Sequence, residues 1–142
     1  MENTNKIKVE FYSLSENELF ARNVISCFAL RLNPSIAEIA DIKTAVSEAV
    51  TNSIVHGYPN DIGKIVLEAS IEGNDLHINV FDFGVGIEDL TEALKPFYTS
   101  KPLDERSGMG FTIMENFMNE VKVESEKGKG VKVYMKKSLN RG

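Results

Sequence analysis

Two glycine-containing turns constrain the fold of this 142-residue chain more than any other feature. One is Gly73-Asn74 and the other is Lys127-Gly128-Lys129-Gly130. Each turn separates two segments of strand-like composition, and a short turn of this kind joins neighbouring antiparallel strands. The four segments lie at about 63–72, 75–83, 120–126 and 131–137. The sequence therefore predicts two β-hairpins.

A further strand and two long helices precede the first hairpin. Apolar and polar residues alternate over 6–12, which predicts a strand. Ser15 and Glu18 have the spacing of a capping box, so a helix should begin there and run to about Leu32. The apolar stretch of this helix contains Cys27, which we expect to be packed inside.

A second helix should begin at Asn33-Pro34, as N-cap and first helical residue, and end near His56. Gly57 then supplies the stop. The apolar residues of this helix recur at steps of three and four, which predicts a core face made of Ile39, Ile42, Val46, Val50 and Ile54.

The segment between the two hairpins should contain a short helix at 87–95, a loop at 96–110 and another helix at 111–119. A loop of about 14 residues inside a compact domain is unusual and tends to be functional. The whole order predicts one α/β domain over 1–142, more specifically an α+β two-layer sandwich. Its sheet should be mixed, mostly antiparallel, with the helices on one face.

Composition excludes several classes of protein. No run of about 18 apolar residues is present, so no membrane-spanning helix is expected. A polar N-terminus and a single cysteine favour the cytoplasm. The net charge of −5 argues against a general role in binding nucleic acid directly.

The second helix carries the first candidate site. Glu48, Asn52 and His56 are spaced four residues apart and so form one stripe, away from the predicted core face. A carboxylate, an amide and an imidazole in line could form a functional site. The alternative is an ordinary solvated helix face.

The second candidate is Asp82-Phe83-Gly84-Val85-Gly86, at the end of a predicted strand. The aspartate can accept a hydrogen bond, while the glycines let backbone come close to a ligand. The letters Asp-Phe-Gly also occur in protein kinases, but this chain has no His-Arg-Asp catalytic loop. It is not a dinucleotide fingerprint either, because Asp89 stands where the third glycine should be.

The third candidate is the loop that leads through Gly108, Met109 and Gly110 into a helix. Backbone N–H groups at a helix N-terminus can bind an anion. The loop adds further donors and positive charge through Thr99, Ser100, Lys101 and Arg106. The alternative is an ordinary surface loop.

The order and spacing of the three motifs resemble those of the GHKL ATP-binding superfamily, which includes gyrase, the Hsp90 chaperones, histidine kinases and MutL. The matching motifs are Glu48-x-x-x-Asn52, Asp82-x-Gly84-x-Gly86 and Gly108-x-Gly110. The segment Pro96-Phe97-Tyr98-Thr99-Ser100-Lys101 is similar to the one that opens the superfamily's ATP lid. The resemblance implies a Bergerat-type ATP-binding fold, with the lid at about 96–110.

Within the superfamily, residues 44–52 and His56-Gly57-Tyr58 resemble the anti-sigma serine kinases of Gram-positive bacteria. Residues 106–118 are most similar to the sporulation anti-sigma-F factors. The resemblance implies a homodimer that binds and inhibits a sigma-F-type sporulation factor. It also implies a serine kinase that uses ATP to phosphorylate and inactivate the anti-anti-sigma protein. One departure is Val131, where the family usually has a threonine that helps to hold the adenine end.

The resemblance also implies a role for each residue of the first two motifs. Glu48 would take the proton from the attacking serine hydroxyl, and Asn52 would bind Mg²⁺. His56 would contact the phosphates or structure the site. Asp82 would accept from the adenine amino group, and Gly84 and Gly86 would let backbone pass the nucleotide.

The lid and the third motif would hold the ATP phosphates. Backbone N–H groups of Gly108, Met109 and Gly110 would bind them, and Arg106 would place positive charge near the γ-phosphate. Arg106 could instead face solvent. The nucleotide-binding residues expected in the lid are Thr99, Ser100 and Lys101.

Three other functions compete with this one. A histidine kinase fragment would need a phosphoacceptor histidine on a dimerisation helix, but the only histidines are His56 and His77. A nucleotide-gated sigma-binding module would lack kinase activity, and Glu48 argues against it. An equivalent regulator of a stress-response sigma factor stays open.

Overall fold

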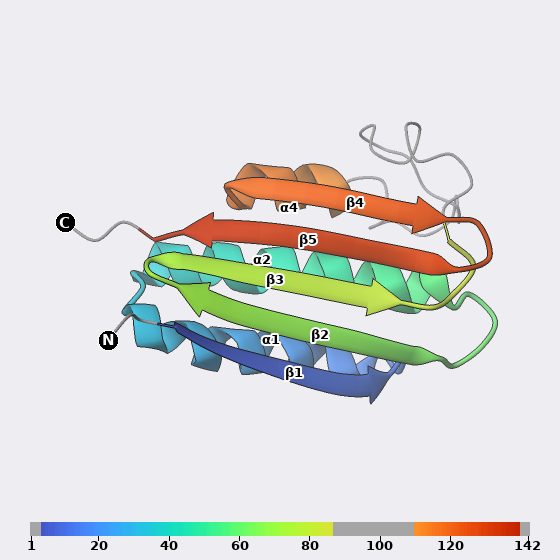
Figure 1. Ribbon diagram of the computed structural model, residues 1–142. Coiled ribbons are helices and arrows are strands. Elements are labelled where there is room, and N and C mark those ends of the chain that lie inside the picture. The colour runs from blue at the N-terminus through green and yellow to red at the C-terminus, as the bar shows by residue number, and fades with distance from the viewer. Residues whose placement is uncertain (1–3, 87–109, 140–142) are drawn as a thin grey trace.

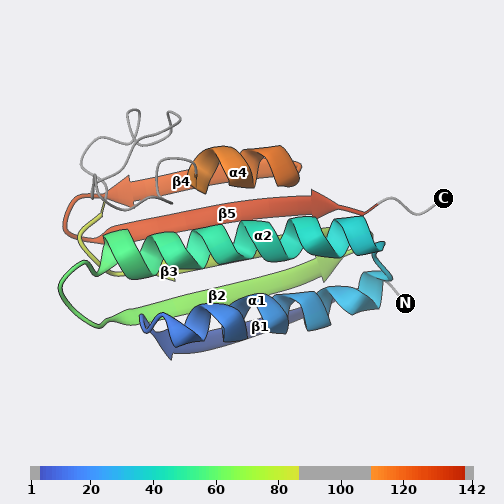
Figure 2. The ribbon, with the colours of Figure 1, turned by 180° about the vertical axis from the view of Figure 1, so that it is seen from behind.

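The computed structural model describes residues 4–86 and 110–139. Over these residues, strands form one sheet in the order β1-β2-β3-β5-β4, and helices cover one of its faces (Figures 1 and 2). The strands are β1 (Thr4–Tyr12), β2 (Lys64–Glu72), β3 (Asp75–Asp82), β4 (Glu120–Glu126) and β5 (Gly130–Ser138). The helical elements are α1 (Glu16–Ala29), the 3₁₀ turn η1 (Leu30–Leu32), α2 (Ile36–Asn52), the π-turn η2 (Ser53–Gly57) and α4 (Gly110–Phe117).

The sheet confirms the predicted strands and hairpins, with one correction. All four strand pairings are antiparallel, so the sheet is not mixed over the described residues. The last strand of the chain explains this result. β5 lies between β3 and β4 and runs antiparallel to both. β3 and β4 therefore run in the same direction, but they are not neighbours in the sheet. The predicted helix at 87–95 and the predicted loop at 96–110 lie outside the described residues, except for Gly110, which begins α4.

The predicted helix start at Ser15 is confirmed, because Ser15 is the N-cap of α1, but its capping box is absent, and the start predicted at Asn33 is wrong by two residues. Ser15 makes no side-chain cap, and Glu18 instead pairs with Arg22 one turn later, at 3.3 Å. Asn33 adopts a left-handed conformation with φ 51° and ends η1. The capping box belongs to Ser35, which accepts from the N–H of Glu38 and thereby starts α2. Asparagine tolerates the left-handed region, which shifts the start of the helix by two residues.

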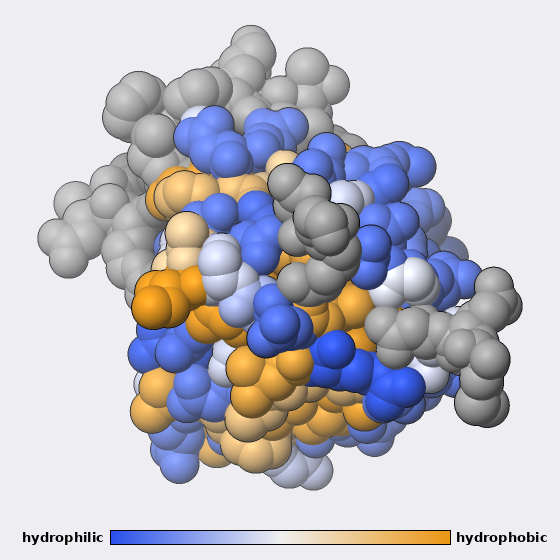
Figure 3. Space-filling model, turned by 90° about the vertical axis from the view of Figure 1, so that its left-hand side faces the viewer, coloured by the Kyte–Doolittle hydropathy of each residue, from blue (hydrophilic) through white to orange (hydrophobic). Residues whose placement is uncertain are grey.

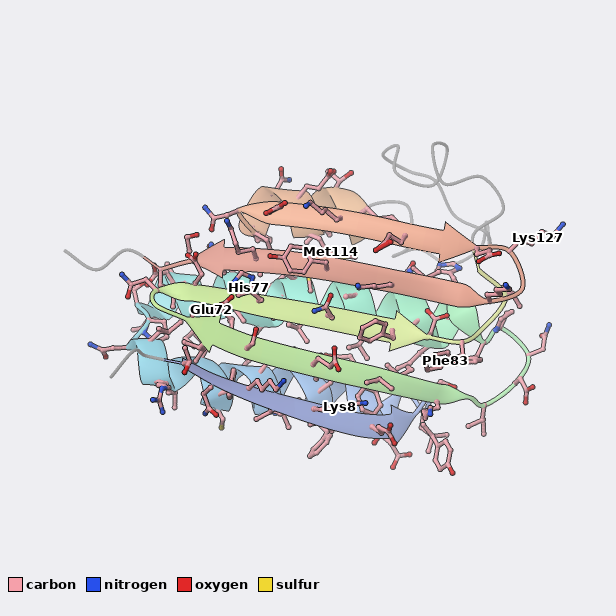
Figure 4. All side chains as sticks on the ribbon, in the orientation of Figure 1. Lys8, Glu72, His77, Phe83, Met114 and Lys127 are labelled. Atoms are coloured by element: carbon pink, nitrogen blue, oxygen red, sulfur yellow. The ribbon has the colours of Figure 1, made fainter. Side chains whose placement is uncertain are left out.

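The core lies between the sheet and the helices. Ile42, Val46 and Val50 of α2 are fully buried, as predicted, while Ile39 and Ile54 are partly buried against them. α4 contributes Met114, which is also fully buried (Figure 4). The sheet completes the core with Ile65, Leu67, Ile78, Val80, Val133 and Met135.

The cysteine and some apolar side chains lie outside this core. Cys27 is exposed, so the expectation that it packs inside is wrong. Ile36 and Leu30 are 91% and 62% exposed, at the end of the molecule where η1 leads into α2. Figure 3 shows that end, where apolar side chains gather mainly in its lower half, bordered by hydrophilic ones.

The other face of the sheet is mostly polar, with Val66 and its cross-strand partner Phe81 as apolar residues on it. Cross-strand neighbours such as Lys8 and Glu68 point away from the helices, alternating with core residues. His77 contacts Tyr134 at 2.7 Å and Glu72 at 3.3 Å on this face (Figure 4). This alternation is typical of an antiparallel sheet with one covered face.

Candidate nucleotide-binding site

Asp82 is the most deeply buried acid among the described residues, with 3% of its surface exposed at the end of β3. Its Oδ1 atom accepts from the N–H of Gly84 at 3.1 Å and from the N–H of Val131 at 3.3 Å. Its Oδ2 atom is buried and has no hydrogen-bond partner among the described residues. A buried acceptor of this kind is unfavourable unless a ligand supplies the donor.

Burial raises the pKa of Asp82 above its ordinary value, because the charged form is poorly solvated. Three hydrogen-bond donors oppose this shift: the N–H of Gly84, the hydroxyl of Ser53 and the N–H of Val131. Burial has the larger effect. The carboxyl group is therefore held in a tight set of donors at the edge of the core, with one oxygen left to accept.

Glycines surround Asp82 because main chain packs directly on main chain there. A Cβ at Gly84 would collide with the carbonyl of Gly57, and one at Gly130 would collide with the carbonyl of Asp82. A Cβ at Gly86 would collide with the carbonyl of Glu126. Gly84 and Gly86 were predicted to let backbone pass a nucleotide. In the structure they let the strand end pass η2 and the β4–β5 turn.

Hydrogen bonds fix the same three segments together. The N–H of Val85 donates to the carbonyl of Gly57 at 2.9 Å, and the N–H of Gly128 donates to the carbonyl of Val85 at 2.7 Å. The Asp82 environment is therefore built by η2, the end of β3 and the β4–β5 turn at once.

Tyr58 adds a clamp that the motifs alone did not assign. Its hydroxyl accepts from the N–H of Phe83 at 2.7 Å and donates to the carbonyl of Lys64 at 2.6 Å. Burial raises the pKa of this phenol. The clamp joins the end of β3 to the start of β2, directly beside Asp82. The sequence signal was its place after His56-Gly57.

The predicted stripe is present on α2 and η2. Glu48, Asn52 and His56 are all half-buried. Asn52 ends the α-helix, and His56 lies in the wider π-turn that follows. Such a turn often occurs at a functional site. The stripe therefore leads from the middle of α2 toward Gly57 and the Asp82 environment.

The first residue of α4 reaches the same stripe. A Cβ built on Gly110 would lie 3.6 Å from Oε1 of Glu48. The structure thus brings the first and third motifs together at Glu48 and Gly110, and the first and second at Gly57 and Gly84. The other predicted residues lie outside the described ones: Thr99, Ser100, Lys101, Arg106, Gly108 and Met109.

The polar groups of the site can be compared with what a nucleotide and a metal ion would need. The buried Oδ2 atom of Asp82 fits an N–H donor such as an exocyclic amine. Residues 4–86 and 110–139 contain no group of three or more His, Cys, Asp or Glu side chains that could hold a metal ion. Mg²⁺ in phosphate sites commonly has only one or two protein ligands, and the amide of Asn52 is a suitable one.

A two-layer fold with a helix stripe, a buried aspartate and a glycine-rich crossing defines a nucleotide-binding domain, and comparison with known proteins agrees. The family model for the histidine kinase-like ATPase domain matches residues 14–137. Among the helices of residues 4–86 and 110–139, none is long and apolar enough to cross a membrane.

Curated relatives narrow the family. The anti-sigma F factor of Clostridium perfringens strain SM101 is 58% identical over 137 residues, covering 96% of this chain and 98% of that protein. The anti-sigma F factor of Thermoanaerobacter sp. strain X514 is 56% identical, covering 98% and 97%. The chain therefore belongs to the histidine kinase-like ATPase family and, within it, to the family of the anti-sigma F factors.

Solved structures support the same fold at lower identity. A structure of the RsbU and RsbW domains of Rv1364c from Mycobacterium tuberculosis matches with a TM-score of 0.71 and 21% identity. The match covers 96% of this chain and 32% of that one. The catalytic domain of the histidine kinase ThkA matches with a TM-score of 0.59 and 17% identity, covering 94% and 96%.

Proposed function

We propose that this protein binds a sigma-F-type sporulation sigma factor and holds it inactive, and that it phosphorylates a serine of an anti-anti-sigma protein with ATP. The observation that carries the proposal is the 55–58% identity to anti-sigma F factors over nearly the whole chain. The protein would act in the cytoplasm as a homodimer.

Adenine recognition is assigned to Asp82. Its unpartnered Oδ2 atom would accept a hydrogen bond from the adenine amino group. Guanine has a carbonyl oxygen at the corresponding position, and two facing acceptors repel each other. The site should therefore prefer ATP or ADP over guanine nucleotides.

Phosphate and metal binding are assigned to α2 and the start of α4. Asn52 would bind Mg²⁺ through its amide oxygen, and Mg²⁺ bound there would neutralise phosphate charge. The N-terminus of α4 at Gly110 would offer N–H groups to the phosphates. His56, Thr99, Ser100, Lys101, Gly108 and Met109 would add phosphate and lid contacts.

Proton transfer is assigned to Glu48. Its carboxylate would accept the proton of the serine hydroxyl as the serine oxygen bonds to the γ-phosphorus and the bond to ADP breaks. Arg106 would stabilise charge on the transferred group. Glu48 lies beside Gly110, which supports its placement at the phosphate end of the site.

Labelled ATP tests the kinase assignment directly. The protein is incubated with γ-labelled ATP, Mg²⁺ and the anti-anti-sigma protein, and label on that protein is counted. Glu48→Gln should lower the rate by about 10²–10⁴ while ATP binding persists. The matched control is Glu115→Gln, on the exposed side of α4, which should transfer label at the normal rate.

Each contrary result has a definite meaning. No label transfer by the wild type would leave a nucleotide-gated sigma-binding module without kinase activity. Transfer unaffected by Glu48→Gln would remove Glu48 as the base. Recovery of a stress-response sigma factor in place of a sigma-F-type factor, by co-purification, would reassign the partner.

Asn52→Ala separates metal binding from catalysis. The variant should lose Mg²⁺-dependent ATP affinity, measured by calorimetry with and without Mg²⁺. Affinity for ATP without Mg²⁺ should change much less, because Asp82 is intact. Equal loss under both conditions would contradict the metal assignment.

A further inference from the structure

Ser53 is one of only three polar residues that are buried over the described ranges, together with Ser13 and Asp82. It is 1% exposed and is the first residue of the π-turn η2. Neither the stripe of the first motif nor the Asp82 motif includes it. A buried hydroxyl normally has a hydrogen-bond partner, so the position of Ser53 needs an explanation.

The partner of Ser53 is the Asp82 carboxylate, where its hydroxyl is one of three hydrogen-bond donors. The other two donors are the backbone N–H groups of Gly84 and Val131. Both donors belong to the main chain, so neither depends on the chemistry of a side chain. Ser53 is therefore the only side chain, among the described residues, whose identity decides how many donors Asp82 has.

The strand next to Asp82 cannot supply this hydroxyl. Val131 lies directly opposite Asp82 in the β3–β5 pairing and is 5% exposed. Side chains of directly opposed residues lie on the same face of the sheet and contact each other. The side chain of Val131 offers only methyl groups to the carboxylate. The polar contact comes instead from the helical layer, through Ser53.

We propose that Ser53 is a specificity-determining residue that acts through Asp82 to select adenine over guanine nucleotides. The proposal rests on ATP binding at Asp82 as proposed above. The Ser53 hydroxyl favours the ionised carboxylate and fixes its orientation. Oδ2 then remains the acceptor that an adenine amino group can reach and that repels a guanine carbonyl.

Removal of the hydroxyl should weaken both effects. With two donors in place of three, the buried carboxylate is protonated more readily and turns more freely. A protonated carboxyl can donate to a guanine carbonyl but no longer accepts as well from the adenine amino group. Adenine binding therefore weakens while guanine is repelled less. A hydrogen bond to a charged group is strong enough for an effect of about tenfold on affinity.

The test is the ratio of the dissociation constants for GTP and ATP, measured by calorimetry at neutral pH on the full chain. Ser53→Ala should weaken ATP binding about tenfold and leave weak GTP binding unchanged or stronger. The matched control is Ser13→Ala. Ser13 is also buried, and its hydroxyl accepts from the N–H of Gly63 at 2.9 Å. This control should keep the wild-type ratio even if its stability falls.

A double variant makes the test specific for the hydroxyl. Val131→Thr, added to Ser53→Ala, returns a hydroxyl to Asp82 from the opposite strand and should restore much of the ratio. An unchanged ratio in Ser53→Ala would overturn the proposal, and so would a double variant no better than Ser53→Ala. Failure of the wild type to bind ATP would instead overturn the proposed function, because the Ser53 comparison presupposes that binding.

Discussion

The proposed adenine end and the proposed phosphate end of the candidate site are built in different ways. At the adenine end, main chain from η2, β3 and the β4–β5 turn meets without side chains between, and Asp82 sits among those segments. At the phosphate end, Glu48 of α2 lies beside Gly110, the first residue of α4. The first arrangement fixes one geometry, whereas the second depends on how two helices sit side by side.

The contacts that hold α4 in place illustrate the second arrangement. Lys137 of β5 donates from Nζ to the carbonyl of Phe117, the last residue of α4, at 2.7 Å. The same Nζ pairs with Asp41 of α2 at 3.1 Å. A positive charge at a helix C-terminus is favourable, and this one also joins α4 to α2. One side chain therefore helps to set the distance between Glu48 and Gly110.

The largest expected effect is at the adenine end. Gly84→Ala places a methyl group against the carbonyl of Gly57, which is a main-chain group held by a hydrogen bond from the N–H of Val85. The free energy of unfolding should fall by more than about 3 kcal/mol, beyond the usual range for an overpacked core. Urea unfolding followed by circular dichroism measures the change.

Gly73→Ala is the matched control, since Gly73 has a φ of +61° in the β2–β3 turn and open space around its Cβ position. Backbone strain alone should lower its stability by about 1–2 kcal/mol. Equal losses at Gly84 and Gly73 would show that main-chain packing is not what distinguishes the adenine end.

A smaller effect is expected from the α4 anchor. Lys137→Met keeps the length of the side chain but removes its charge, leaving Asp41 and the carbonyl of Phe117 without their donor. Stability should fall by about 1–3 kcal/mol, because the Lys137 side chain is only 14% exposed. Lys136→Met is the control: it is 31% exposed and 3.9 Å from Glu120, so its loss should be under about 1 kcal/mol.

Lys137→Met also tests whether the two ends of the candidate site are independent of each other. If α4 shifts, the phosphotransfer rate of Lys137→Met should fall while the GTP-to-ATP ratio stays at the wild-type value. A changed GTP-to-ATP ratio together with an unchanged phosphotransfer rate would mean that Lys137 supports the adenine end and not the phosphate end. Both are measured on protein kept well below its unfolding temperature.

Local features were predictable from the sequence, while contacts between distant segments were not. The hairpins at Gly73 and Gly128 were predicted because a turn and its flanking strands are neighbours in the chain. The insertion of β5 between β3 and β4 was missed because the order of strands is decided by long-range pairing.

The site shows the same limit. The spacing of Glu48, Asn52 and His56 predicted their common stripe, which needs only the helical repeat. The contact between Gly57 and Gly84 joins segments about 27 residues apart, and no local pattern encodes it. Ser53 was missed because a serine next to an asparagine has no distinctive signal before its burial is known.

The smallest effect expected is the pH dependence of Asp82. Burial raises its pKa, so the folded protein without nucleotide keeps the proton on this carboxyl to a higher pH than the unfolded chain does. The stability that this group contributes is complete below its unfolded pKa and is lost as the pH rises through the folded pKa. In the proposed site adenine binds the ionised carboxylate, so ATP affinity should change in the opposite sense and fall as the pH is lowered through the folded pKa.

Calorimetric titration with ATP between about pH 4.5 and 7.5 measures this dependence. Asp82→Asn removes the ionisable group and serves as the control for protonation of ATP itself. The affinity of the wild type should decline at low pH more steeply than that of Asp82→Asn. Ser53→Ala should move the decline to higher pH, because one of the donors that oppose the raised pKa is gone. Parallel curves for all three proteins would mean that the Asp82 carboxylate does not decide adenine affinity, and the adenine end would then depend on main-chain packing alone.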